Sequence, residues 1–274
     1  MPHKSSLLFP LLGLLVAALW TACLAYGTVP IPPLDVVRIL LGHTVDPAAW
    51  STIVLESRLP QATTALLVGA SLAAAGLLLQ TLFRNPLAGP AILGIMVGYL
   101  ASSLISLLNF YASADRIRGF VMWGMGDFSS VSNARLPFFA LCTVGGLTAA
   151  LLLVKPLNAL LLGERYATNL GVKIRRTRVL ILLCTGLLTA TATAFCGPVS
   201  FIGLAVPHVA RLTLGRADHR LLLPVTMLLG SAMALLCNLL TVIPGTGTVF
   251  PLNAVTPIFG APVIIYVILR RRGV

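Results

Sequence analysis

The chain has 274 residues, of which 58% are apolar and only 9% are charged, and its formal net charge is +12. A soluble domain carries about 25% charged residues, so this composition excludes a water-soluble fold and predicts an all-α, multi-pass membrane protein. The basic excess would also suit a nucleic-acid-binding protein, but the placement of the charges along the chain argues against that class.

Apolar stretches of roughly 18 to 25 residues recur along the sequence, and each is long enough to cross about 30 Å of hydrocarbon. They predict seven transmembrane helices and, in a shorter and weaker stretch at 199–214, an eighth. We therefore expect one helical transmembrane domain over residues 1–274. The seven stretches are 5–26, 62–83, 91–112, 136–162, 179–196, 221–243 and 252–269.

The positive residues indicate the orientation of these helices. With eight spans and a cytoplasmic N-terminus, the cytoplasmic loops hold the whole net charge of +12 and the outer loops are neutral. Cytoplasmic loops of membrane proteins carry an excess of Lys and Arg, so the charge reflects topology. Both termini are therefore predicted to be cytoplasmic, and no nucleic-acid partner is expected.

Apart from Lys155 in the stretch 136–162, the seven clear spans contain no Asp, Glu, Lys, Arg or His in their interiors. Proton- and ion-coupled transporters usually place such groups near the middle of the membrane, so their absence counts against that class. The sequence has no GxxxxGK[ST] or GxGxxG nucleotide motif and no HExxH, and its five cysteines lack metal-ligand spacing. We expect a chain that is not an enzyme and needs no cofactor and no metal site.

Small residues are spaced for close helix packing. Gly69, Ala73 and Gly76 lie along one face of the second span, and Gly94 and Gly98 form a GxxxG pattern in the third. We interpret both sets as packing surfaces.

Two histidines lie near the weak eighth span. His208 follows Pro207, and a single histidine without a nearby carboxylate or cysteine is more often structural than a metal ligand. His219 follows Asp218 in a turn that we expect to be solvated.

The cytoplasmic loop at 162–178 mixes a short amphipathic stretch with basic residues. Gly163 and Gly171 bracket about two helical turns, on which Tyr166, Ala167 and Leu170 are expected to share one side. This loop is either an ordinary solvated connector or a short helix that docks into a soluble partner.

Seven stretches, in order from about residue 50 to the C-terminus, carry a family resemblance: 58–60 with 67–76, 80–88, 122–126, 163–172, 197–211, 218–220 and 255–262. Together they resemble the FecCD family, the permease subunits of type II ABC importers for iron-siderophores, haem and cobalamin. The resemblance implies a multi-pass permease of the bacterial cytoplasmic (inner) membrane. It also implies four kinds of partner: a second permease copy or paralogue, two ABC ATPase subunits, an extracytoplasmic substrate-binding protein and membrane lipid.

The resemblance also implies roles for individual residues. The coupling loop would span 156–178, and the ATPase would contact Gly163, Glu164, Ala167, Leu170 and Gly171. A gate loop would be formed by four consecutive residues, Asn85, Pro86, Leu87 and Ala88.

The outer end of the second span resembles the Arg-Leu-Pro-Arg pattern with which relatives receive the binding protein. Arg58 is present and is expected to contribute to docking, but Gln61 replaces the second arginine. Docking should therefore be weaker or differently arranged than in relatives.

The predicted number of spans also departs from the family, whose members typically have ten. Residues 94–126 read as though the start of the third family span were joined to the end of the fifth. Losing one out-and-back pair of helices preserves the side on which each terminus lies, in agreement with the charge distribution.

Two other functions are compatible with the sequence. The chain could be an ion-coupled or facilitative transporter, which would move its substrate in liposomes without an ATPase. It could also be a degenerate permease that no longer transports and serves as a membrane scaffold, which ATP-dependent uptake by the reconstituted complex would exclude.

The topology predicts that a thiol at position 116 faces outside and one at position 175 faces the cytoplasm. We expect Arg116→Cys, in a background without the native cysteines, to react with a membrane-impermeant maleimide in intact cells. Arg175→Cys should react only after the membrane is opened. Reaction of both positions in intact cells would contradict eight spans.

Overall fold

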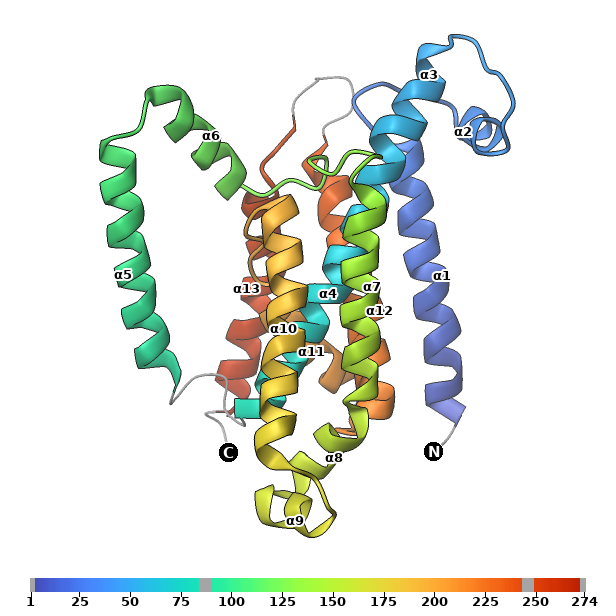
Figure 1. Cartoon of the computed structure of the whole chain (residues 1–274). Helices are drawn as coiled ribbons and strands as arrows, with labels where there is room; N and C mark the ends of the chain where they lie inside the picture. The colour runs from blue at the N-terminus through green and yellow to red at the C-terminus, as the bar shows by residue number, and fades with distance from the viewer. Residues whose placement is uncertain (1–2, 84–89, 243–248, 272–274) are drawn as a thin grey trace.

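The structure, a computed structural model, describes residues 3–83, 90–242 and 249–271 and is helical, with no β-strand in those ranges. The helices are numbered in chain order in Figure 1. They are α1 (His3–Ala25), α2 (Pro33–Leu40), α3 (Ala49–Thr52), the π-helix η1 (Ile53–Arg58), α4 (Leu59–Phe83), α5 (Pro90–Phe110), α6 (Ala114–Gly124), α7 (Leu136–Leu152), α8 (Val154–Leu162), α9 (Glu164–Asn169), α10 (Ile174–Cys196), α11 (Ile202–Leu214), α12 (His219–Thr241) and α13 (Leu252–Arg271).

Every predicted span contains a helix, and the helical membrane fold is confirmed. Among the described residues, four helical stretches are long and apolar enough to cross a membrane unaided: Leu7–Ala25, Ala49–Phe83, Ile174–Cys196 and His219–Thr241. The pair α7 and α8, bent by 45°, could form a fifth crossing. The apolar helices in α5, α11 and α13 are shorter.

The chain begins and ends at one end of the bundle. Helix α1 starts, and α13 finishes, at the end that also carries α9, whereas α2, α3 and α6 lie at the opposite end (Figure 1). We call these the α9 end and the α2 end. Both termini on one side agrees with the predicted parity of the crossings, and the assignment of the α9 end to the cytoplasm stays a prediction.

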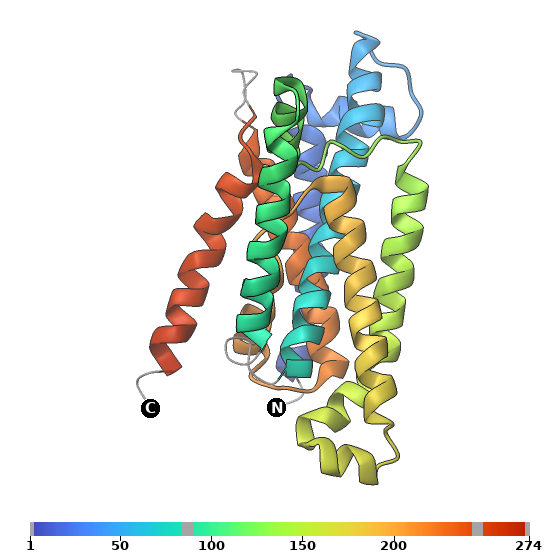
Figure 2. The ribbon, with the colours of Figure 1, turned by 60° about the vertical axis from the view of Figure 1, so that its left-hand side comes forward.

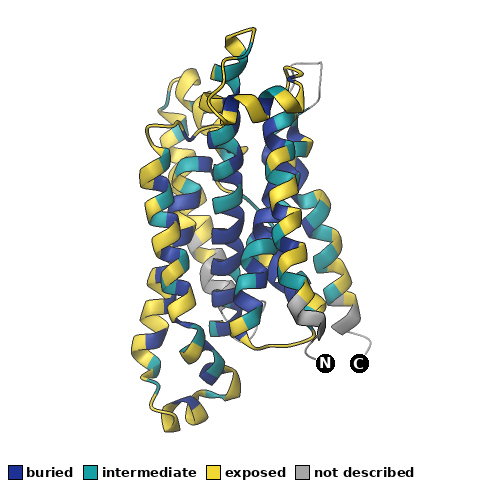
Figure 3. Ribbon diagram, turned by 90° about the vertical axis from the view of Figure 1, so that its right-hand side faces the viewer, coloured by how far each residue is buried: buried dark blue, intermediate teal, exposed yellow. Residues whose placement is uncertain are grey.

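The surface of the bundle is apolar along most of its height. Figure 3 shows exposed residues along the outward faces of the long helices and buried residues toward the interior. Large side chains such as Leu14, Leu141 and Leu183 are more than half exposed. In water this pattern would be costly, whereas in a bilayer these side chains contact hydrocarbon.

Helix α4 is the centre of the bundle because its small residues let neighbouring backbones approach. A Cβ added to Gly69 would lie 2.2 Å from the carbonyl oxygen of Gly230 in α12, and one added to Gly76 would lie 1.8 Å from that of Gly203 in α11. Small residues permit such contacts between membrane helices. The predicted packing role of Gly69, Ala73 and Gly76 is confirmed, and Ala73 is fully buried between them.

The α5–α6 segment stands away from this core. Figure 1 shows α5 apart from the other helices and joined to the bundle through α6 at the α2 end, and in the turned view of Figure 2 it lies in front of them. The side chains of Met96, Tyr99 and Leu108 are 64%, 75% and 70% exposed, and nothing lies within 4 Å of a Cβ placed on Gly98. The isolated helix coincides with residues 94–126, where the sequence predicts that a pair of family helices is missing.

The close approach at Gly69 predicts a large effect from one added methyl group. Gly69→Ala should lower the free energy of unfolding by about 1–3 kcal/mol, the usual cost of overpacking, because the Cβ would meet a backbone carbonyl that cannot rotate away. Thermal unfolding in detergent would measure the change. Gly186→Ala on α10 is the matched control, since its Cβ would have nothing within 4 Å; equal effects of the two substitutions would contradict the packing model.

Candidate functional site

At the α9 end, the chain turns back from α8 to α10 through the short helix α9 (Figure 1). Gly163, which precedes α9, has φ of +115°, and Gly171, which follows it, has φ of +82°. Residues other than glycine rarely adopt such φ angles. These two glycines therefore allow the chain to turn sharply on each side of α9, and the short helix predicted between them is present.

The apolar residues of α9 do not share one side, so that expectation was wrong. Ala167 is fully buried, and its carbonyl accepts a hydrogen bond from the backbone N–H of Val172 at 3.0 Å. Tyr166 and Leu170 are 67% and 64% exposed. Neighbouring residues of a helix are rotated by about 100°, so Ala167 holds α9 on the bundle while Tyr166 and Leu170 face outward.

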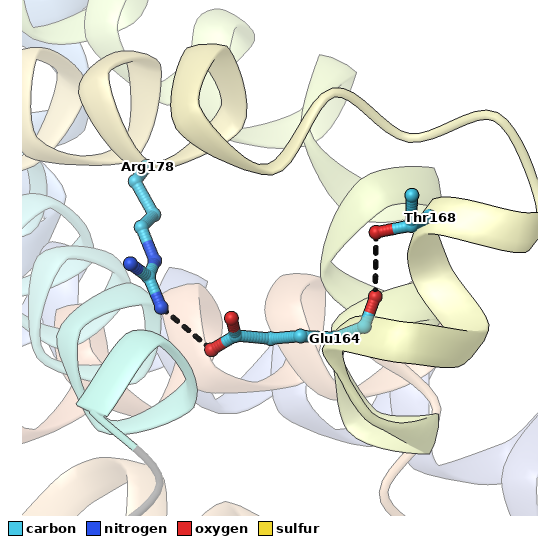
Figure 4. Close-up of polar contacts among 3 residues, drawn as sticks. All are labelled: Glu164, Thr168 and Arg178. Carbon is cyan, nitrogen blue, oxygen red and sulfur yellow. Dashed lines mark hydrogen bonds and ion pairs between the residues drawn. The ribbon is translucent and has the colours of Figure 1, made fainter.

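Glu164 joins α9 to the start of α10. Its carboxylate accepts a hydrogen bond from Arg178 Nη2 at 2.6 Å, and its backbone carbonyl accepts one from the Thr168 hydroxyl at 2.8 Å (Figure 4). Both charged side chains remain about half exposed. An exposed ion pair contributes about 0.2–1 kcal/mol, so the pair orders the loop only weakly and leaves both charges accessible.

A polar junction lies where α8 meets α12, with Asp218 exposed and Asn158 partly buried. The Asn158 side chain accepts from the backbone N–H of His219 at 2.8 Å and donates to Asp218 Oδ1 at 2.6 Å. Asp218 also caps α12 by accepting from the Arg220 backbone N–H. That backbone bond and the Asn158 amide hold the pKa of Asp218 below its usual value. His219 is 1% exposed, so the expectation of a solvated histidine was wrong.

A second polar contact ties α11 to α4. Arg211 Nη1 donates to Gln80 Oε1 at 2.6 Å and lies 3.2 Å from His208 Nδ1. Gln80 in turn donates to the carbonyl of Leu204 at 3.2 Å. His208 therefore takes part in a hydrogen-bonded set, and within the described residues no group of three His, Cys, Asp or Glu side chains could hold a metal ion.

Arg58 lies at the α2 end, beside a cavity of about 650 Å³ that is bounded by α1, α4, α6, α12 and the start of α13. It is 6% exposed, and its guanidinium donates to the carbonyls of Leu24 and Ala25 at 2.9 Å each and to that of Val29. A cation suits the carbonyl-rich C-terminus of a helix. Arg58 thus caps the C-terminal end of α1 by donating to its last carbonyls.

The position of Arg58 follows from the sequence around it. Pro60 lacks an N–H and disturbs the regular hydrogen-bond ladder, and the π-helix η1 immediately precedes it, with Leu59 N–H bonded to the Val54 carbonyl five residues earlier. The Gln61 amide, which replaces the second family arginine, donates to Asn238 Oδ1 at 3.0 Å. The structure does not test docking by Arg58, and the predicted gate residues Asn85, Pro86, Leu87 and Ala88 lie outside the described residues.

Asn253, at the start of α13, was missed by the sequence analysis. Its Nδ2 donates to the carbonyls of Gly124 at 3.0 Å and Pro198 at 2.6 Å, and its Oδ1 accepts from the backbone N–H and the hydroxyl of Ser200, both at 3.2 Å. One amide therefore satisfies the end of α6 and the non-helical link between α10 and α11. Irregular backbone inside a membrane protein needs such internal partners.

The comparisons with known proteins agree with this architecture. The model of the FecCD transport family matches residues 14–101 and 92–270. The Fe(3+) dicitrate transport system permease protein FecC of Escherichia coli is 34% identical over 95% of this chain and 97% of its own length. The hemin transport system permease protein HmuU of Yersinia pestis is 29% identical over 86% of this chain and 88% of its own.

A solved structure has the same overall arrangement. An inward-facing conformation of a putative metal-chelate type ABC transporter superposes with a TM-score of 0.81 and 27% identity, covering 97% of this chain and 99% of the solved one. The vitamin B12 import system permease protein BtuC of Klebsiella pneumoniae is 28% identical over 84% of this chain and 87% of its own.

The comparisons also bear on the missing helices. The two stretches matched by the family model overlap at residues 92–101, within α5. The alignment with FecC extends over 328 positions, more than the 274 residues of this chain. FecC therefore contains residues without a counterpart here, which supports the predicted loss of a helix pair between residues 94 and 126.

The Asn253 contacts predict that this residue stabilises the α2 end. Asn253→Ala should lower the free energy of unfolding by about 2 kcal/mol, because three backbone groups in two segments lose their partners. Thermal unfolding would measure the loss. Asn133→Ala is the control, since Asn133 is exposed and donates only one bond, to the Leu55 carbonyl. An unfolding temperature unchanged by Asn253→Ala would show that the amide is dispensable.

Proposed function

Because this chain belongs to the FecCD transport family and is a permease subunit of an ABC importer, we propose that it moves a chelated metal across the cytoplasmic membrane. The chain is a multi-pass membrane protein, and its relatives are transport permeases rather than enzymes. The observation that carries the proposal is the match to FecC, which covers almost the full length of both chains.

The substrate class follows from the relatives. Their names specify ferric dicitrate, hemin and vitamin B12, and each of these is a metal held in an organic chelate. We infer a cargo of that kind, delivered to the α2 end by an extracytoplasmic substrate-binding protein. The scaffold function, in which a shortened chain assembles without transporting, is the competing proposal.

The ATPase contact is proposed at α9. The loop projects from the α9 end, presents the exposed side chains of Tyr166 and Leu170, and keeps the Glu164 carboxylate half exposed. The two neighbouring glycines allow the sharp turns on either side of it. The coupling loop at 156–178 would place this surface against the ATPase through Gly163, Glu164, Ala167, Leu170 and Gly171. Ala167 is buried and would contribute by packing α9 against the bundle.

A second permease copy or paralogue is proposed at the α5 side. Ser102 and Ser106, with Gly98, lie four residues apart along α5, and all three are exposed. The Ser106 hydroxyl is already bonded within α5, to the Ser102 carbonyl at 2.9 Å, but small polar faces of membrane helices usually contact another helix. Two permeases and two ATPases would then form the transporter.

The proposed contact predicts that Glu164→Ala uncouples the transporter. Chelate uptake should fall about tenfold, the effect of losing one hydrogen bond to a charged group, while the permease folds and the ATPases still hydrolyse ATP. The Gly171→Pro variant should also uncouple, because it alters the exit from α9. Uptake and ATP hydrolysis would be measured together in reconstituted vesicles.

Arg178→Ala is the matched control for Glu164→Ala. It removes the same ion pair but keeps the carboxylate, so it separates contact with the ATPase from ordering of the loop. Uptake should remain close to that of the unmodified protein. Normal uptake by both Glu164→Ala and Gly171→Pro would refute the assignment of α9 as the ATPase contact.

A further inference from the structure

Resting on the proposed ATPase contact at α9, we propose that Asn158 and His219 form a relay that transmits movement of the α8–α9 unit to α12 and to the adjoining end of α4. Asn158 acts in this relay as a positioning residue. The relay would convert displacement of a cytoplasmic loop into displacement of the helix at the centre of the bundle.

Helix α8 is placed to work as a lever. It is joined to α9 by the single residue Gly163, and its inward side chains Leu157 and Leu160 are buried in the apolar cluster that contains Leu78 of α4 and Leu222 of α12. Apolar contacts of this kind are not directional. Packing alone therefore fixes the direction in which α8 moves its neighbours less sharply than hydrogen bonds do.

The hydrogen bonds at Asn158 supply the direction. Its Oδ1 must face the His219 backbone N–H, which can only donate, and this fixes the amide so that Nδ2 donates to Asp218. The same Oδ1 lies 2.9 Å from His219 Nδ1, so the neutral imidazole carries its proton on Nδ1. Asn158 thus holds both the capping residue and the first residue of α12.

The imidazole extends the connection to α4. With the proton on Nδ1, Nε2 of His219 is an acceptor. The Thr81 hydroxyl lies 2.8 Å from it and 2.9 Å from the carbonyl of Leu77, so its one proton is shared between these two acceptors. Thr81 is in the last turn of α4 and is 7% exposed, while His219 is 1% exposed. Water therefore has little access to the bond between these two side chains, and breaking it leaves Nε2 of His219 unsatisfied. When α8 moves, α12 and α4 must follow or lose the bonds.

The relay predicts a change in coupling efficiency. Asn158→Ala and Thr81→Val should each lower the amount of chelate taken up per ATP hydrolysed by about two- to thirtyfold, the range for substitutions along a connected network. Lys155→Ala is the control on α8, because Lys155 is exposed. Thr81→Val keeps the side-chain volume and serves as the test if Asn158→Ala lowers the yield of folded protein.

The double variant separates a relay from two independent defects. Asn158 and Thr81 are not hydrogen-bonded to each other and are linked through His219. If they act through it, the double variant should be no worse than the more affected single variant, whereas independent effects would multiply. An unchanged uptake-to-hydrolysis ratio in both single variants, or multiplied effects in the double variant, would overturn the relay.

A readout without the ATPase distinguishes failure of the relay from failure of the proposed function. The unfolding temperatures of the two single variants and the double variant should also be non-additive in the isolated permease. Absence of ATPase binding by the unmodified protein would refute the contact at α9, and with it the coupling role of the relay. If the decreases in unfolding temperature caused by the two single substitutions add up in the double variant, the hydrogen-bonded link itself is refuted.

Discussion

Backbone contact at the glycines of α4 is the constraint on which the rest of the structure depends. At Gly69 and Gly76 there is no room for a Cβ, because carbonyl groups of α12 and α11 occupy its place. Between helices in a membrane there is little hydrophobic driving force, so such close packing is a main source of association. Because α4 is packed so tightly, a displacement at either of its ends is shared with α11 and α12.

Polar side chains then join the two ends of this packed core to the loops. At the α2 end, Asn253 satisfies backbone groups of α6 and of the link between α10 and α11. At the α9 end, Asn158 and His219 join α8 to α12 and α4. In both places one amide uses its donor and acceptor together. Such hydrogen bonds suit a transporter because they fix the relative position of two segments without filling the space between them.

The helices could be predicted from the sequence because each depends on a local property. An uninterrupted apolar stretch indicates a span, regular small residues indicate close packing, and the bracketing glycines indicated the ends of α9. These signals do not require knowledge of distant contacts. The weak stretch at 199–214 was harder, and it is a short helix, Ile202–Leu214, preceded by a non-helical link.

The polar contacts could not be predicted in the same way. Asn253 is more than fifty residues from Pro198 and more than a hundred from Gly124, and His219 is buried only because α8 and α4 fold over it. Docking by Arg58 stays a prediction, and the bonds from its guanidinium to the carbonyls of α1 could not be read from the sequence. That Ala167 is buried while Tyr166 is exposed also depends on which side of α9 packs against the bundle.

Uptake of a ferric chelate into proteoliposomes is the most direct test of ATP-driven import by this chain. The permease would be incorporated alone and together with its ATPase, with the binding protein and chelate added outside, and each sample measured with and without internal ATP. Uptake should occur only when ATPase and ATP are both present. Equal uptake by the permease alone, or uptake that follows an imposed ion gradient, would contradict import powered by an ATPase at α9.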